Sequence, residues 1–246
     1  MMYSNRSGFF SSLPVVTKNL LLINVIFWIA SITLPSITLR FFGRPFDLID
    51  WLGMHFILSD KFNAAQMVSY MFLHDTRSFT HLFFNMFSVF MFGRVLESVW
   101  GPKRFLTFYL FTGIGAGVIQ QLTWVYDMWP IITANVPIVD SMHAIIPKSL
   151  IFDQAITIGA SGAVFGILLG FGMMFPNAPL YLMFIPIPIK AKYLMIGYGL
   201  IELFMGVASF RGDNVAHFAH LGGMLFAYIM IRMWKNKSMN DGNYYR

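Results

Sequence analysis

The stretch Ala155–Phe175 reads AITIGASGAVFGILLGFGMMF and is followed by Pro176-Asn177. It carries no charged residue, and a helix that crosses a bilayer needs roughly 20 mostly apolar residues. The stretch therefore predicts a membrane-spanning helix that ends at the proline, which cannot continue a helix. Its glycines are spaced as in a packing seam of small residues between membrane helices, and the hydroxyl of Ser161 lies among them.

Five further segments have the length and apolar character of membrane spans. The predicted fold is thus all-α, a polytopic membrane protein built as a bundle of six transmembrane helices. We expect a short N-terminal segment (1–18), one membrane domain (19–234) and a short C-terminal tail (235–246). The five other spans are Asn19–Leu34, which stops at Pro35, Phe79–Val99, Phe105–Val125, Ala191–Phe210 and Asn214–Trp234.

Two other stretches are apolar but too interrupted to span. Ser36–Ser78 mixes aromatic patches with charged residues, so it is predicted as a long loop partly submerged at the membrane interface. Connections of this length are usually functional. Leu180–Ile189 is broken by Pro186 and Pro188, and it is predicted to lie at the interface as well.

The composition supports the membrane class. The chain is 57% hydrophobic and only 11% charged, with a mean hydropathy of +0.64, whereas a soluble domain carries about 25% charged residues. The net charge of +6 would suit nucleic acid, but the basic residues form short clusters between apolar stretches. We therefore expect no nucleic-acid partner and instead contact with anionic lipid headgroups. The chain has no cysteine, which excludes disulfide and thiolate chemistry.

The basic residues also predict an orientation. With six spans, both ends of the chain and the 2–3 and 4–5 turns share one side of the membrane. That side holds 11 of the 17 basic residues, and basic loops favour the cytoplasm. We expect a multi-pass protein of the cell membrane with both termini cytoplasmic. The 11 residues are Arg6, Lys18, Arg94, Lys103, Arg104, Lys190, Lys192, Arg232, Lys235, Lys237 and Arg246.

Three polar motifs lie inside apolar spans: His81-Leu-Phe-Phe-Asn85, Gly159-Ala-Ser161-Gly162 and His217-Phe-Ala-His220-Leu-Gly-Gly223. Each belongs to an even-numbered span that enters from the outer side. The polar residues lie about six residues past the span starts, which is roughly 9 Å at the helical rise. The topology therefore predicts a hydroxyl, an imidazole and an amide at similar depth on three helices.

These residue types suit acyl transfer. A serine hydroxyl becomes a nucleophile when a neighbouring histidine accepts its proton, which makes Ser161 and His220 the candidate pair. His81 and Asn85, four residues apart on one helical face, are candidate donors to an oxyanion. The backbone N–H of Ser161 is a further donor. None of the motifs contains a carboxylate, so we interpret the site as a Ser–His dyad.

The three motifs, in this order and topology, resemble those of the rhomboid family of intramembrane serine proteases, over roughly Gln66 to Ala227. The resemblance implies cleavage of membrane-anchored substrates near the membrane surface without cofactor or metal. Ser161 would be the nucleophile, His220 the base, and His81, Asn85 and the Ser161 amide the oxyanion site. Phe165 stands where the family often has a tyrosine stacked on the imidazole, and Gly159, Gly162 and Gly223 would support the site.

Two positions depart from the family pattern. The tryptophan-arginine pair that some members carry in the first loop is absent, since Leu52 follows Trp51. The small residue four positions after Gly223 is Ala227 instead of glycine, which loosens the case for close packing of the sixth helix. Neither change touches the residues proposed for the chemistry.

For several residues, other roles stay open beside the one proposed. Ser161 could serve only as a polar contact in the glycine seam. His217 and His220 could bind a metal, but the metalloprotease pattern His-Glu-x-x-His is absent and no metal is expected. Glu202, inside the fifth span, is either functional or a hydrogen-bonded acid that faces the bundle. His74 is expected to make a hydrogen bond within the first loop.

Two other functions stay open. A catalytically inactive rhomboid relative would bind membrane clients, but such relatives typically lack the serine or the histidine, and both are present. A small transporter would be expected to show inverted repeats, and the two halves of this sequence show no such pairing.

Overall fold

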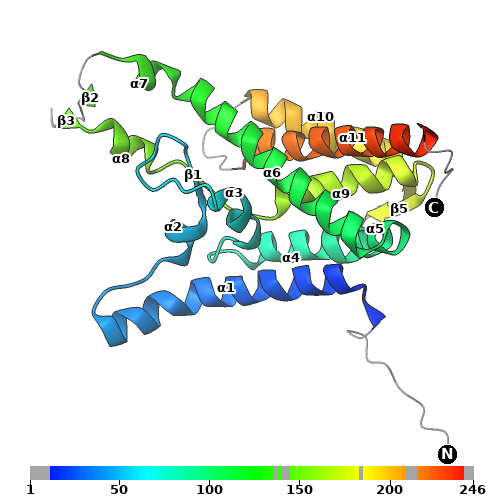
Figure 1. Ribbon diagram of the computed structural model, residues 1–246, viewed down its shortest axis with the longest axis horizontal. Coiled ribbons are helices and arrows are strands. Elements are labelled where there is room, and N and C mark those ends of the chain that lie inside the picture. Colours follow the sequence, from blue (N-terminus) through cyan, green and yellow to red (C-terminus); the bar gives the residue numbers. More distant parts are fainter. Residues whose placement is uncertain (1–11, 136–137, 140–144, 183–184, 209–214, 241–246) are drawn as a thin grey trace, which may run out of the picture.

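Long helices that run in alternating directions build the molecule (Figure 1), and the N-terminal end of α1 lies at the same end of the bundle as the C-terminal end of α11. This computed structural model describes residues 12–135, 138–139, 145–182, 185–208 and 215–240. The helices of the bundle are α1 (Val15–Phe42), α4 (Phe79–Ser88), α5 (Arg94–Trp100), α6 (Pro102–Asp127), α9 (Ser161–Met174), α10 (Ala191–Ala208) and α11 (His217–Asn240).

Short elements connect these helices. Antiparallel pairing joins β1 to β4, β2 to β3, and β5 to β6. The short helices are α2 (Leu48–Leu52), α3 (Gln66–Ser69), the 3₁₀ turn η2 (Tyr70–Phe72), α7 (Trp129–Thr133) and α8 (Lys148–Phe152), and the strands are β1 (Met54–His55), β2 (Ile138–Val139), β3 (Ile145–Ile146), β4 (Ile156–Thr157), β5 (Pro179–Leu182) and β6 (Ile185–Lys190).

The predicted all-α membrane class is confirmed. Among the described residues, four helices are long and apolar enough to cross a bilayer: α1, the helix Phe79–Trp100, α6 and α10. The second of these joins α4 and α5 through a π-helical turn, η3 (Val89–Gly93). The apolar helix α9 has 14 residues and so is about 21 Å long, shorter than a hydrocarbon core of about 30 Å. The predicted helices occur in the expected order, and their count of six crossings stays a prediction.

The end of the first predicted span was wrong. Pro35 does not stop the helix, because α1 continues through it to Phe42. A proline removes one backbone donor, a loss that membrane helices tolerate when neighbouring groups compensate. The helix instead ends at Gly43, whose φ of 71° allows its N–H to bond the carbonyl of Leu39. Glycine adopts this left-handed conformation at no steric cost.

The start of the fourth predicted span was also wrong. The helix begins at Ser161 and not at Ala155. The preceding residues are extended because Ile156 and Thr157 of β4 pair with His55 and Met54 of β1. This pairing uses the backbone groups that a longer helix would need. It also joins the long first loop to the segment that leads into α9.

The stretch Leu180–Ile189 was predicted to lie at the interface. Its described residues belong to the antiparallel strands β5 and β6, with Leu180 opposite Ile189. The end of the fifth predicted span, Phe210, and the start of the sixth, Asn214, lie outside the described residues.

The centre of the bundle is the contact between α6, α9 and α11 (Figure 1). Glycines allow these backbones to approach closely. A Cβ at Gly223 of α11 would clash with the carbonyl oxygen of Gly162 of α9, and a Cβ at Gly166 would lie 2.7 Å from Cβ of Thr112. The small-residue seam read from the sequence is therefore a real packing surface. It holds the start of α9 against the first turns of α11.

Glu97 is the cap of the first helix. Its carboxylate accepts from the backbone N–H of Val16 at 2.9 Å and of Thr17 at 2.7 Å, and from the Thr17 hydroxyl at 2.7 Å. The first amides of a helix lack intrahelical partners, and a negative charge is favourable at this end. Arg94, which lies three residues before Glu97, contacts the Phe90 ring at 4.6 Å from its centroid.

Candidate active site

Ser161 and His220 meet at the crossing of α9 and α11. The distance from Ser161 Oγ to His220 Nε2 is 2.8 Å, which is within hydrogen-bonding reach. Ser161 is the first residue of α9, and His220 lies one turn into α11. His220 is buried, and Ser161 is partly exposed. The hydroxyl therefore faces an imidazole that can accept its proton.

Phe165 fixes the plane of the imidazole. Its ring lies parallel to that of His220, at a centroid distance of 4.3 Å and an interplanar angle of 10°. Phe165 follows Ser161 by four residues, so both side chains lie on the same face of α9. One helix face thus presents both the hydroxyl and the surface on which the histidine packs.

The start of α9 places backbone donors beside the serine. The N–H of Ser161 belongs to the first turn, whose amides have no partner within the helix. The partial positive charge at a helix N-terminus favours an anion there. The sequence-based expectation of a depth of six residues within a helix was wrong for Ser161. An extended strand, and not a helical turn, carries the chain to this position.

His81 lies against the backbone just before Ser161. A Cβ at Gly159 would lie 3.0 Å from both Cε1 and Nε2 of His81, and 3.6 Å from Ser161 Oγ. Gly159 has φ 129°, which side chains rarely adopt. Its missing side chain therefore leaves the space that the His81 ring and the Ser161 hydroxyl share.

The hydrogen bond at Nδ1 of His81 determines which nitrogen of this ring carries the proton. The backbone N–H of Asp75 lies 3.3 Å from Nδ1 of His81, so Nδ1 acts as an acceptor and Nε2 carries the proton. Asn85 is buried, and its Nδ2 donates to the carbonyl of His81 at 2.8 Å. An amide nitrogen has two protons, so the second proton of Asn85 is left for another acceptor.

The carboxylate of Glu202 contacts the imidazole rings of His220 and His217. Glu202 Oε2 lies 2.9 Å from Nδ1 of His220 and 2.6 Å from Nδ1 of His217. Among the described residues, Glu202, His217 and His220 form a group whose ligand atoms all lie within 4.8 Å of one another, close enough to consider a metal ion. The sequence marked Glu202 only as an acid in an apolar span and did not reveal its partners.

His74 is buried beside His81, with ring centroids 5.0 Å apart. Neither ring nitrogen has a hydrogen-bond partner among the described residues, so the hydrogen bond expected from the sequence is not found there. Burial, together with the neighbouring His81, lowers the pKa of His74 to about 3. His74 is therefore a neutral packing residue behind His81.

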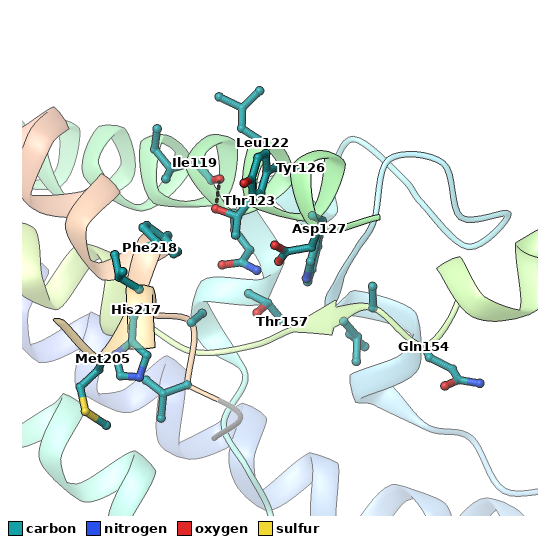
Figure 2. Close-up of a pocket in the computed structure, with 18 residues that line it drawn as sticks. Ile119, Leu122, Thr123, Tyr126, Asp127, Gln154, Thr157, Met205, His217 and Phe218 are labelled. Atoms are coloured by element: carbon teal, nitrogen blue, oxygen red, sulfur yellow. Dashed lines mark hydrogen bonds between the residues drawn. The ribbon is translucent and has the colours of Figure 1, made fainter. Parts of the chain in front are cut away.

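A cavity of about 980 Å³ lies beside the site, between the end of α6, β4 and the region where α10 and α11 face each other (Figure 2). Its lining combines apolar groups such as Met205 and Phe218 with polar groups such as Thr157 and Asp127. Of the charged or imidazole side chains around Ser161, only His217 is among the described lining residues. The cavity thus borders the group formed by Glu202, His217 and His220, and it does so at His217.

The comparisons with known proteins identify the family. The family model of the Rhomboid domain matches residues 61–236. The chain is also 30% identical over 156 residues to "RHOMBOID-like protein 12, mitochondrial" from Arabidopsis thaliana. That alignment covers 61% of this chain and 40% of the relative, so the chain spans less than half of the relative's length. Since the domain match covers most of the sequence and includes all three motifs, the chain belongs to the rhomboid family.

Proposed function

We propose that the chain is an intramembrane serine endopeptidase that uses Ser161 and His220 to hydrolyse peptide bonds of membrane-anchored proteins. The observation that carries the proposal is the 2.8 Å contact between Ser161 Oγ and His220 Nε2. Membership of the rhomboid family supports the reaction class. The parallel Phe165 ring supports the same assignment, because it holds the imidazole in the plane that this contact requires.

The reaction would proceed in two acyl-transfer steps. His220 Nε2 takes the Ser161 proton while Oγ attacks the scissile carbonyl carbon, and the resulting imidazolium then gives that proton to the leaving amine. Water would hydrolyse the acyl-enzyme with His220 again as base. The dyad proposed here needs no metal or cofactor for either step.

The oxyanion of each tetrahedral intermediate would be held by fixed donors. The Ser161 amide, Nε2–H of His81 and the remaining Nδ2 proton of Asn85 all belong to elements around the serine. Preorganised donors of this kind stabilise charge as it develops, and loss of one typically lowers kcat by roughly 10²–10³-fold.

The substrates would be protein segments that enter from the bilayer. A fully hydrogen-bonded helix hides its carbonyls, so we expect cleavage near residues that break or weaken a helix. Equal cleavage of tightly helical and locally unwound segments would contradict this part of the proposal.

The test uses the full chain in detergent, a fluorophosphonate probe and a model substrate with one membrane span. We expect labelling and cleavage by the wild type, and loss of both in Ser161→Ala. Ser98→Ala is a matched control, because among the described residues the Ser98 hydroxyl donates to the Arg94 carbonyl within its own helix. Labelling that survives in Ser161→Ala would remove the serine from its role. Absence of labelling and cleavage in the wild type would favour a client-binding relative.

We also propose that the protein lies in the cell membrane with both termini of the chain in the cytoplasm. The distribution of basic residues supports this orientation. A reporter fused after residue 246 should be active only on the cytoplasmic side, and activity on the other side would reverse the orientation.

A further inference from the structure

Glu202 is an acid in a stretch of α10 whose adjacent residues face outward. Its neighbours Leu200, Ile201, Leu203 and Phe204 are all exposed on α10, whereas the side chain of Glu202 is only 12% exposed. An ionisable group within a membrane span is costly unless it has partners. The position of Glu202 therefore depends on what it contacts inside the bundle.

Its partners connect it to Ser161 through one imidazole. Glu202 Oε2 lies 2.9 Å from Nδ1 of His220, and the other nitrogen of the same ring lies 2.8 Å from Ser161 Oγ. Carboxylate, imidazole and hydroxyl thus form a continuous line of hydrogen bonds. Three different helices, α10, α11 and α9, contribute one group each.

The chemistry of the carboxylate decides where the imidazole proton lies. An ionised carboxylate only accepts hydrogen bonds, so Nδ1 of His220 must be the donor to Glu202. In a neutral imidazole the proton on Nδ1 leaves Nε2 with a free lone pair. Nε2 can then accept the Ser161 proton. In the opposite tautomer, Nε2–H would face the hydroxyl and could not act as a base.

We propose that Glu202 is a positioning residue that holds His220 in the Nδ1–H tautomer, so that the site operates as a Ser161–His220–Glu202 triad. The inference rests on the proposed protease function. His217, whose Nδ1 lies 2.6 Å from the same oxygen, holds the carboxylate in place. The sequence suggested a dyad because the third member belongs to a helix that carries none of the three motifs.

The distances favour hydrogen bonds over a metal ion shared by these three residues. Tetrahedral Zn²⁺ with bonds of about 2.0–2.1 Å would separate its ligand atoms by about 3.3 Å. The two contacts of Oε2 are 2.6 and 2.9 Å. Both are shorter than that separation and close to the length of charge-assisted N–H···O bonds, about 2.7–2.9 Å. The cluster therefore suits two protons held between two imidazoles and a carboxylate.

The first test compares kcat and KM in the full chain. Glu202→Gln removes the charge but keeps the shape, and we expect kcat to fall by roughly 10²-fold or more with KM nearly unchanged, as for other orienting carboxylates. Glu202→Asp should recover part of that loss. The matched control is Glu97→Gln, which alters a buried acid whose described contacts are all with the start of α1, and its kcat should stay within about twofold of the wild type.

The outcomes separate this inference from the proposed function. A wild type that is active and loses activity in Ser161→Ala, together with an unchanged kcat in Glu202→Gln, would overturn the triad and leave the protease. Loss of activity on chelation with recovery on addition of Zn²⁺ would also overturn it, since the cluster would then bind a metal.

A second measurement does not depend on activity. Nitrogen-15 NMR of histidine-labelled protein distinguishes protonated from unprotonated ring nitrogens, and His217→Asn helps to assign the signals. We expect a protonated Nδ1 and an unprotonated Nε2 for His220 in the wild type. We expect a mixture of tautomers in Glu202→Leu. A wild-type His220 protonated on Nε2 alone would refute the proposal even if the variants failed to fold.

Discussion

At the scale of single residues, the site depends on a position without a side chain, Gly159. Gly159 turns the backbone with φ 129° and leaves room for the ring of His81. The sequence revealed this glycine as part of a motif, but the reason for it is the close approach of an imidazole from another helix. Neither the sign of φ nor that neighbour can be deduced from local sequence.

Gly159→Ala should displace His81. A Cβ at this position meets the imidazole at 3.0 Å, and the positive φ adds strain of about 1–3 kcal/mol. We expect kcat to fall by roughly 10²-fold, the loss typical of one oxyanion donor. Gly43→Ala is the matched control, since Gly43 also has positive φ but its added Cβ would meet no described atom within 4 Å. Equal rates in the two variants would contradict the role of His81.

His74 predicts a dependence of stability on pH. Its pKa is lowered from 6.5 to about 3 in the folded protein, so between these values the unfolded chain binds a proton that the folded protein does not. The contribution of neutral His74 to the free energy of unfolding is fully present above pH 6.5. It is lost as the pH falls toward 3, by up to about 1.4 kcal/mol per pH unit. Thermal unfolding of His74→Phe should show a weaker acid destabilisation than the wild type. Parallel pH profiles would contradict the prediction.

At the scale of elements, α1 is fastened to the bundle at its first turn. Glu97 lies in α5, about 80 residues away in sequence from its partners, so no local pattern links it to the start of α1. This contact therefore could not be predicted from the sequence. The length of α1 was also underestimated, because Pro35 is compatible with a helix in this setting.

Glu97→Ala should loosen the start of α1. It leaves the amides of Val16 and Thr17 without their acceptors, and loss of hydrogen bonds to a charged group costs about 1.5–3 kcal/mol. We expect faster hydrogen exchange of these two amides and a lower unfolding temperature in detergent. Glu97→Gln keeps one acceptor oxygen and should have a smaller effect. Unchanged exchange in Glu97→Ala would show that the cap contributes nothing.

At the scale of the whole molecule, the alternating direction of the helices was predictable from hydropathy. The second, fourth and sixth predicted spans do bring the three motifs together. The start of α9 was not predictable, because it depends on pairing between β1 and β4, about 100 residues apart in sequence. The contact of Glu202 with two histidines was not predictable either. It depends on how α10 is rotated, and an exposed helix has no strong apolar face that would fix this rotation from sequence.

The close crossing of α9 and α11 should be required for both stability and activity. Gly223→Ala places a Cβ against the backbone of Gly162, which cannot move as a side chain does. We expect a loss of about 1–3 kcal/mol in the free energy of unfolding and slower probe labelling of Ser161. Gly197→Ala is the matched control on α10, where an added Cβ meets no atom of the described part of the chain within 4 Å. A fully stable and active Gly223→Ala protein would contradict this account.

The strand pair β1–β4 also limits how a substrate can arrive. It fastens the long first loop to the residues just before Ser161, and Gln121 of α6 adds a second attachment by bonding the His55 carbonyl and the Ile57 amide. A loop tethered in this way cannot swing open as a hinged flap without dislodging the serine itself. We therefore expect a substrate segment to slide in sideways from the lipid between neighbouring helices.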